Sequence, residues 1–257
     1  MPRKSCMIKK NPIDLRRPVV KLTGRRLKLK IYELLNAEDF PASLEFICQF
    51  PARQSINAFL SFFYSKEELI KWRAIAAMGR VASKLADENM ESARVVMRRL
   101  MWNLNDESGG IGWGSPEAMG EIMAMHKGLA NEFCNILRSY ICENENYLEH
   151  EMLQRGVVWG IGRLAQACPE ILPQTESHIY PFLKSVDACH RGFAAWALGN
   201  FKSLPAAAAL NALSEDNAQI LFFNDLQLKP VTVGLLAKEA LEKIIKSNPD
   251  KPEKCLK

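Results

Sequence analysis

The chain has 257 residues, of which 48% are hydrophobic and 25% charged, so it can form a sizeable core and general disorder is not expected. No apolar run reaches membrane-spanning length, because Arg163 interrupts the best candidate at 157–168. The basic first residues contain no continuous apolar stretch, so the sequence predicts neither a membrane span nor a secretory signal.

The charge is divided unevenly along the chain. The first 30 residues hold 11 Lys or Arg and one acid, whereas the other 227 residues hold 23 bases and 28 acids. Residues 1–26 are therefore predicted to form a basic, partly extended arm, which also contains Pro2, Pro12 and Pro18. Such an arm can contact nucleic acid, but basic ends are more often solvated or dock on their own body.

Short helical segments are predicted to follow the arm. The first helix is expected at 27–36, and Pro41 and Pro51 stand where they suit the first turns of the next two. Residues 65–68 (Ser-Lys-Glu-Glu) have the pattern of a capping box. They are expected to open a helix that runs to about residue 85 and is apolar on nearly every face, so it is predicted to be covered on several sides.

The next helix, at 90–104, has the pattern of an amphipathic helix with one solvated face. Val95, Val96, Leu100 and Leu104 are expected to face the core. Its arginines are expected to point away from that core: Arg94, Arg98 and Arg99.

The same alternation predicts further helix pairs to the end of the chain. A last, less regular helix is expected to open at Pro230, and 248–257 is a charged tail. One pair is expected at about 116–127, with a partner helix that ends at about 142. The other helices are expected at about 149–167, 174–184, 187–202 and 205–213.

A block of small residues recurs at nearly constant spacing. Its glycines, Gly79, Gly120, Gly162 and Gly199, are 41, 42 and 37 residues apart. A period near 40 without strand-like alternation is typical of stacked helix pairs, because one pair cannot cover its own apolar face. The sequence thus predicts a single all-α solenoid domain over 27–247, with about five helix pairs.

The last block resembles a known repeat family. Residues 187–199, from Asp187 through Arg191 to an Ala-Ala-x-Ala-Leu-Gly run, resemble the consensus of HEAT-like repeats, including the phycobilisome-lyase type, and 72–79 and 155–162 look like weaker copies. This resemblance implies a right-handed α-solenoid of the armadillo superfamily. It also implies an Asp–Arg ladder between repeats, in which three arginines are structural and paired with carboxylates: Arg73, Arg155 and Arg191.

The repeat pattern breaks in the middle of the chain. Gly114 stands where the alignment expects the counterpart of Arg73, within a loop at 103–117 that has four glycines in six residues. Ser115-Pro116 is a suitable helix start, expected to point its free N–H groups outward. The loop is either a binding element or a long turn with Trp102 and Trp113 packed over it.

No catalytic or metal-binding pattern is found in the sequence. The four histidines have no metal-ligand spacing, and the seven cysteines, which form no CxxC pair, favour reduced thiols and a cytoplasmic protein. We therefore predict no catalytic residue, no metal and no cofactor.

The leading hypothesis is a non-enzymatic scaffold that binds a protein partner through the concave groove and the irregular loop. The predicted contacts lie on the central repeats: Trp102, Asn105, Asp106, Glu107, Gly110, Gly112, Trp113, Glu117, Trp159 and Arg163.

Two enzymatic alternatives remain open. Some HEAT-like proteins are alkylpurine DNA glycosylases, which have aromatic residues and an Asp in a basic groove. Residues 111–113 together with Asp106 faintly resemble that set of residues. The acidic body is unfavourable for binding phosphates, although the arginines of 90–104 supply a short basic stripe. A phycobilisome-type cofactor lyase is the other alternative, although no specific residue supports it.

Overall fold

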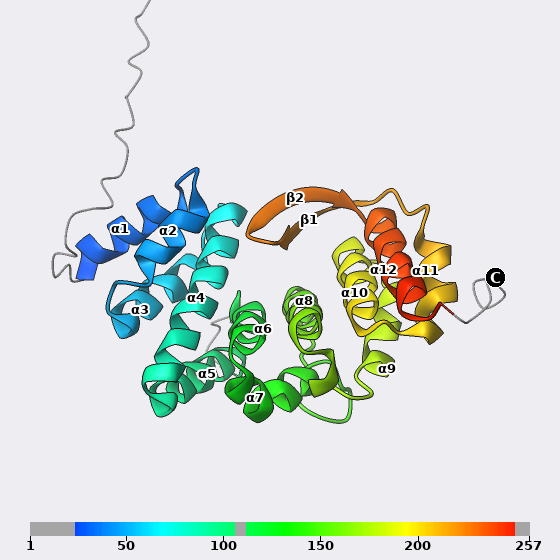
Figure 1. Ribbon diagram of the computed structural model, residues 1–257, viewed down its shortest axis with the longest axis horizontal. Coiled ribbons are helices and arrows are strands. Elements are labelled where there is room, and N and C mark those ends of the chain that lie inside the picture. The colour runs from blue at the N-terminus through cyan, green and yellow to red at the C-terminus, as the bar shows by residue number, and fades with distance from the viewer. Residues whose placement is uncertain (1–23, 106–111, 250–257) are drawn as a thin grey trace, which may run out of the picture.

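The computed structural model describes residues 24–105 and 112–249, which fold into an arch of stacked helices (Figure 1). Two strands near the C-terminal end form the one sheet in these ranges. The α-helices are α1 (Gly24–Leu35), α2 (Phe40–Ile47), α3 (Ala52–Phe62), α4 (Glu68–Glu88), α5 (Met90–Leu104), α6 (Ser115–Met125), α7 (Lys127–Ser139), α8 (Glu151–Ala167), α9 (Glu176–Ile179), α10 (Ala188–Phe201), α11 (Ala207–Leu213) and α12 (Val233–Ser247). Three 3₁₀ segments, η1 (Pro169–Ile171), η2 (Tyr180–Lys184) and η3 (Leu204–Ala206), and the strands β1 (Gln219–Asn224) and β2 (Gln227–Thr232) complete the described elements.

The inner wall of the arch is a row of helices in the order α4, α6, α8, α10, α12, each packed on the next. In Figure 1, α5 and α7 lie on the outer side of this row. The recurring small-residue blocks lie on these inner helices and are almost completely buried. The α-solenoid predicted from their spacing is confirmed, and with it the resemblance to HEAT-like repeats at the level of the fold.

The tightest contact in this row joins α6 and α8. A Cβ atom built on Gly120 would lie 2.4 Å from the Cα atom of Gly160, closer than real Cβ atoms approach other atoms. Only glycine leaves room for two helix backbones at this distance. The block glycines therefore set the spacing of the stack.

The predictions for α4 and α5 are confirmed only in part. The bounds of α5 are as predicted, and the Asn89 side chain caps it by accepting from the Ser92 N–H. The predicted capping box is wrong, because the Ser65 hydroxyl instead accepts from the Glu67 N–H in a turn before α4 begins. Val95 is also wrongly assigned to the core, since it is 53% exposed and its neighbours carry the buried face of α5.

The arginine ladder is present on the later repeats. Arg155 donates to Asp187 at 2.6 Å, and Arg191 donates to Asp216 at 2.8 Å. The prediction of a carboxylate partner for Arg73 is wrong. The Arg73 guanidinium instead donates to two carbonyl oxygens, one at the end of α1 and one just beyond it, each at 2.7 Å. The negative end of the helix dipole takes the place of an acid there.

Two predicted helices differ from the elements that the structure shows. The helix expected at 174–184 is divided into α9 and η2, with Pro181 in the first turn of η2. Pro230 does not open the last helix, because it lies in β2, and α12 begins at Val233 with the Thr232 side chain as its cap. The pattern Leu-Lys-Pro-Val at 228–231 therefore forms a strand of an antiparallel hairpin, opposite 220–223 of β1.

This hairpin crosses the open side of the arch, from α12 towards α4 (Figure 1). The Phe223 ring stacks on Trp72 of α4, with centroids 5.4 Å apart and planes at 12°. The Trp159 indole N–H of α8 donates to the Phe223 carbonyl oxygen at 3.1 Å. The hairpin thus ties α12 to helices far from it in the stack.

The ends of the chain are only partly described. The first helix begins at Gly24, inside the predicted arm at 1–26, and residues 1–23 and 250–257 lie outside the described ranges. In the ranges that are described, none of the helices has both the length and the apolar character needed to cross a membrane.

The Gly120–Gly160 contact predicts a large effect of a single methyl group. Gly120→Ala is expected to lower the free energy of unfolding by about 2 kcal/mol or more, since the rigid backbone of α8 must move. Gly128→Ala in α7 is the control, because its Cβ would meet the ends of the Met90 and His126 side chains. Urea denaturation measures both, and equal losses would contradict the argument.

The hairpin contact predicts a second, separable effect. Phe223→Ala is expected to cost about 3 kcal/mol, because a buried aromatic ring that covers two tryptophans is removed. Tryptophan fluorescence should also shift to longer wavelength as water reaches Trp72 and Trp159. Leu221→Ala on the same strand, where the side chain is 46% exposed, should change both readouts little. Equal effects of the two substitutions would show that the hairpin is not held by Phe223.

Candidate functional site

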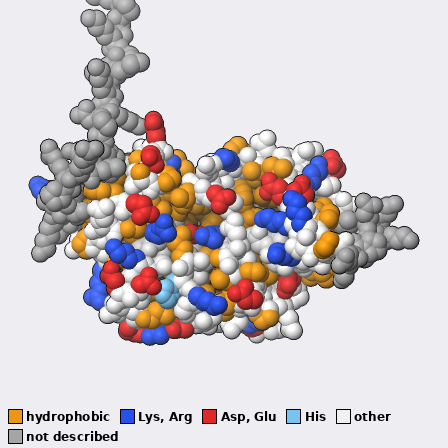
Figure 2. Space-filling view, in the orientation of Figure 1, with side chains coloured by type: hydrophobic (Ala, Val, Ile, Leu, Met, Phe, Trp, Pro, Cys, Tyr) orange, Lys and Arg blue, Asp and Glu red, His pale blue; other side chains and the backbone are white. Residues whose placement is uncertain are grey.

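The hollow at the hairpin tip is the candidate site. It has a volume of about 280 Å³ and lies between α4, α6, α8 and the tip of the hairpin. In Figure 2 this face of the molecule is hollowed between α4 and α8, with basic atoms at the centre and hydrophobic side chains around them. The hollow is lined by Leu44, Arg80, Glu121, Met125, Trp159, Arg163, Gln166, Phe223, Asn224, Asp225 and Leu226.

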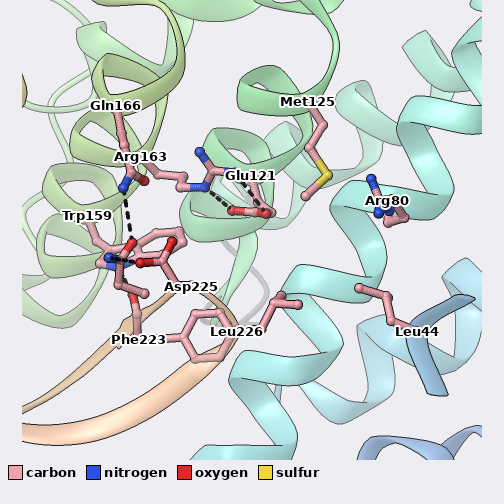
Figure 3. Close-up of a pocket in the computed structure, with 11 residues that line it drawn as sticks. Leu44, Arg80, Glu121, Met125, Trp159, Arg163, Gln166, Phe223, Asp225 and Leu226 are labelled. Atoms are coloured by element: carbon pink, nitrogen blue, oxygen red, sulfur yellow. Dashed lines mark hydrogen bonds and ion pairs between the residues drawn. The ribbon is translucent and has the colours of Figure 1, made fainter. Parts of the chain in front are cut away.

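An ion pair inside the stack forms the centre of the hollow (Figure 3). The Arg163 Nε donates to Glu121 Oε2 at 2.7 Å, and its Nη2 reaches Oε1 at 3.4 Å. Burial raises the pKa of Glu121, and the charges of Arg163 and Arg80 oppose that rise. The Glu121 side chain is almost fully buried while Arg163 remains one-fifth exposed, so the guanidinium is the part of the pair that a ligand can reach.

The rim of the hollow is polar and also internally paired. Arg80 lies on the far side of Glu121 from Arg163 in Figure 3, and it bonds Glu45 at 3.0 Å. Gln166 donates to the side chain of Asn224 at 3.3 Å, which fixes the hairpin tip to α8.

The turn of the hairpin supplies the remaining wall. Asp225 and Leu226 both have left-handed backbone angles, with φ of 48° and 61°. Two-residue turns of this kind favour Asn or Asp followed by Gly, so a leucine at the second position is unusual. The Leu226 side chain packs against the apolar core and lines the hollow.

The structure brings two of the sequence-predicted contacts together in this hollow. Trp159 and Arg163, four residues apart on α8, both line it. The indole of Trp159 is buried in the floor, whereas Arg163 is partly exposed.

The other predicted contacts lie elsewhere. Trp102 on α5 is 79% exposed and Asn105 follows it at the end of that helix, also exposed. Trp113 is half-buried, edge-on to His150 with centroids 5.6 Å apart. Gly112 is buried against the backbone of Asn103. Asp106, Glu107 and Gly110 lie outside the described residues.

The start of α6 is covered rather than pointing outward as predicted. Gly114 has φ of 73° and packs on the Phe63 ring, and Ser115, Pro116 and Glu117 are all buried. The N–H groups of this first turn are therefore not available to an outside ligand.

Glu117 is a buried carboxylate without a full set of partners. Its Oε2 has no hydrogen-bond partner, and its side chain lies against Gly156 of α8, where a Cβ would come within 2.5 Å of that oxygen. Burial raises the pKa of Glu117, and the nearby ammonium of Lys71 opposes that rise. Glu117 is thus a buried and incompletely paired part of the core rather than a residue exposed to a partner.

Sequence reasoning missed Arg80, Glu121 and the hairpin tip. The signal for the first two was present, because a polar residue directly follows each block glycine: Arg80, Glu121, Arg163 and Asn200. Equivalent positions of stacked repeats form a row. Asn200 belongs to this row through its bond to the Gly162 carbonyl oxygen at 3.0 Å.

The basic stripe on α5 is already neutralised or bonded. Arg94 pairs with Glu132 at 2.7 Å, Arg98 bonds Glu91 at 2.5 Å, and Arg99 donates to the side chain of Asn57. Across 24–105 and 112–249 there is also no cluster of three or more His, Cys, Asp or Glu side chains that could hold a metal ion.

Comparisons with known proteins give only distant matches. No family model matches the chain. A protein of Archaeoglobus fulgidus described as uncharacterized is 26% identical over 144 residues, covering 54% of this chain and 70% of its own length. Similar solved structures include a designed armadillo repeat protein in complex with the peptide (KR)4 (TM-score 0.48, 16% identity, 85% of this chain and 99% of that one) and an archaeal HEAT-like repeats protein from Thermococcus onnurineus NA1 (TM-score 0.38, 15% identity, 85% and 80%). These values are too low to transfer a function to this chain.

The buried Glu117 predicts a pH-dependent gain from a neutral substitute. Its pKa is higher in the folded protein than its ordinary value of 4.5, so its ionisation costs stability as the pH rises above that value. Glu117→Gln should therefore raise the free energy of unfolding at pH 7 by about 1–3 kcal/mol, and the gain should disappear near pH 4. Thermal unfolding from pH 4 to 8 measures it, with the exposed Glu239→Gln as control. A variant less stable than the wild type at pH 7 would contradict the unpaired state of Glu117.

Proposed function

We propose that this protein is a non-enzymatic interaction module of the HEAT-like repeat type, which binds a protein partner over the hollow at the hairpin tip. The observation that carries the proposal is the position of the hairpin. It covers the aromatic residues on the open side of the arch, yet leaves a hollow at its own tip that joins apolar walls to an arginine-containing rim.

The composition of this surface supports a protein as the ligand. Interfaces between proteins combine apolar anchors at the centre with a polar rim, and arginine is enriched among the residues that carry binding energy. Here Met125 and Leu226 provide half-buried apolar surface, and Arg80, Gln166 and Asp225 surround it with exposed polar groups.

A second contact is proposed beside the irregular loop. Trp102 exposes 79% of its surface close to that loop, and large exposed aromatic side chains are frequent at interfaces. This would let one partner engage both the hollow and the loop, or two partners engage them separately.

The two enzymatic alternatives have less support. A hollow of about 280 Å³ is below the range of roughly 300–1,000 Å³ that is usual for small-molecule and cofactor pockets. The arginines of α5 that could have formed a phosphate-binding stripe have protein partners. Charged side chains facing the hollow are of both signs, which does not favour a polyanion.

Two matched arginines test the location of the partner site. Arg80 is 51% exposed and pairs with Glu45, and Arg98 is 50% exposed and pairs with Glu91. Affinity purification from the native host, with nuclease treatment, should recover a specific protein with wild type and with Arg98→Glu. Recovery should fall about tenfold or more with Arg80→Glu, because the charge at the rim of the hollow is reversed. Recovery by Arg80→Glu at the wild-type level, or of nucleic acid alone, would overturn the proposal.

A further inference from the structure

We infer that the hollow at the hairpin tip accepts one large, uncharged aromatic side chain, tryptophan or tyrosine, from the protein partner. This inference rests on the proposed function and names the chemical class of the group that the same site would bind. Three independent features of the hollow carry it: its size, the pairing of its charges, and the leucine in its turn.

The size of the hollow fits one side chain. A volume of about 280 Å³ is small for a cofactor but ample for a single indole or phenol ring. The Trp159 and Phe223 side chains in its walls are almost fully buried, so the apolar surface that an occupant can reach comes mainly from the half-buried Met125 and Leu226. An aromatic ring packs favourably on a methionine thioether and on aliphatic side chains, so these two residues suit a ring.

Three of the four charged groups that line the hollow are already paired, and the fourth, Asp225, is exposed at the rim, where an ion pair adds little energy; both facts disfavour a charged occupant. Arg163 is bonded to Glu121, and Arg80 to Glu45. A carboxylate or ammonium entering the hollow would lose water and would have to compete with one of these pairs. Asp225 accepts a hydrogen bond from the neighbouring Asn224 side chain, and its exposed carboxylate can accept another. A neutral donor such as an indole N–H or a phenol O–H satisfies that acceptor without an unpaired charge.

The turn residue Leu226 is the third observation. A leucine with φ of 61° is strained, and glycine would relieve the strain at this position of the turn. Its side chain nevertheless forms the wall of the hollow, and Figure 3 shows it between Phe223 and Leu44. A side chain kept in a strained turn is explained if it contacts the occupant of the hollow.

The test uses small neutral and charged probes on the full chain. The indole N–H of Trp159, which donates to the Phe223 carbonyl oxygen beside the hollow, is a built-in NMR reporter. In ¹⁵N–¹H spectra, N-acetyl-tryptophanamide is expected to shift this signal in a saturable manner, with a dissociation constant in the millimolar range or below. N-acetyl-argininamide and N-acetyl-glutamic acid amide should not shift it at the same concentrations.

The variant Leu226→Gly separates binding from folding. It removes the wall and the backbone strain together, so the spectrum should remain that of a folded protein while the tryptophan probe binds about fivefold or more weakly. Leu221→Ala, on the hairpin but outside the hollow, should bind the probe as wild type does. Equal binding by Leu226→Gly, or a tighter response to a charged probe, would overturn the inference.

The two proposals fail in different ways. If Arg80→Glu abolishes recovery of the partner but no aromatic probe moves the Trp159 signal, the site stands and its aromatic occupant does not. If the probe binds but Arg80→Glu recovers the partner normally, the hollow binds aromatic groups and is not where the protein partner docks.

Discussion

The close approach of helix backbones at the small-residue blocks is the constraint on which the rest of the structure depends. At the contact between Gly120 and Gly160 there is no space even for a methyl group, so the distance between α6 and α8 is fixed by the absence of side chains. Similarly, Gly162 lies against the ring of Trp196, and Gly199 lies against the backbone of α12. Because each inner helix lies so close to the next, residues at equivalent positions of successive repeats meet directly.

Glycine in this stack also makes room for carboxylates. The Glu121 side chain lies against Gly79 of α4 and reaches Arg163 of α8, so it is buried with a partner. Glu117, one turn earlier on the same helix, lies against Gly156 and retains an oxygen without a partner. Two chemically identical residues on one helix therefore differ in energy because only one of them faces an arginine.

The sequence predicts the stack well and the hairpin poorly, for physical reasons. A repeat with a fixed period encodes the same helix packing several times. One wrong local prediction, such as the capping box at Ser65, therefore does not change the predicted fold. The hairpin occurs once, its turn is Asp225-Leu226 instead of a glycine-containing pair, and Pro230 normally suggests a helix start or a break. Its strands gain their stability from docking on Trp72 and Trp159, which no local pattern encodes.

The same reasoning explains which site residues could be found. Trp159 and Arg163 belong to a repeat block and were recognisable, and Glu121 follows the block glycine at the position equivalent to Arg163. The hollow itself could not be predicted, because its fourth wall is the hairpin tip. By filling the middle of the open side with Phe223, the chain converts a long aromatic surface into one bounded hollow at the tip of the hairpin. A partner that docked as proposed would meet a site of about one residue's size whose arginines are already paired, a surface that selects by shape and hydrogen bonding more than by charge.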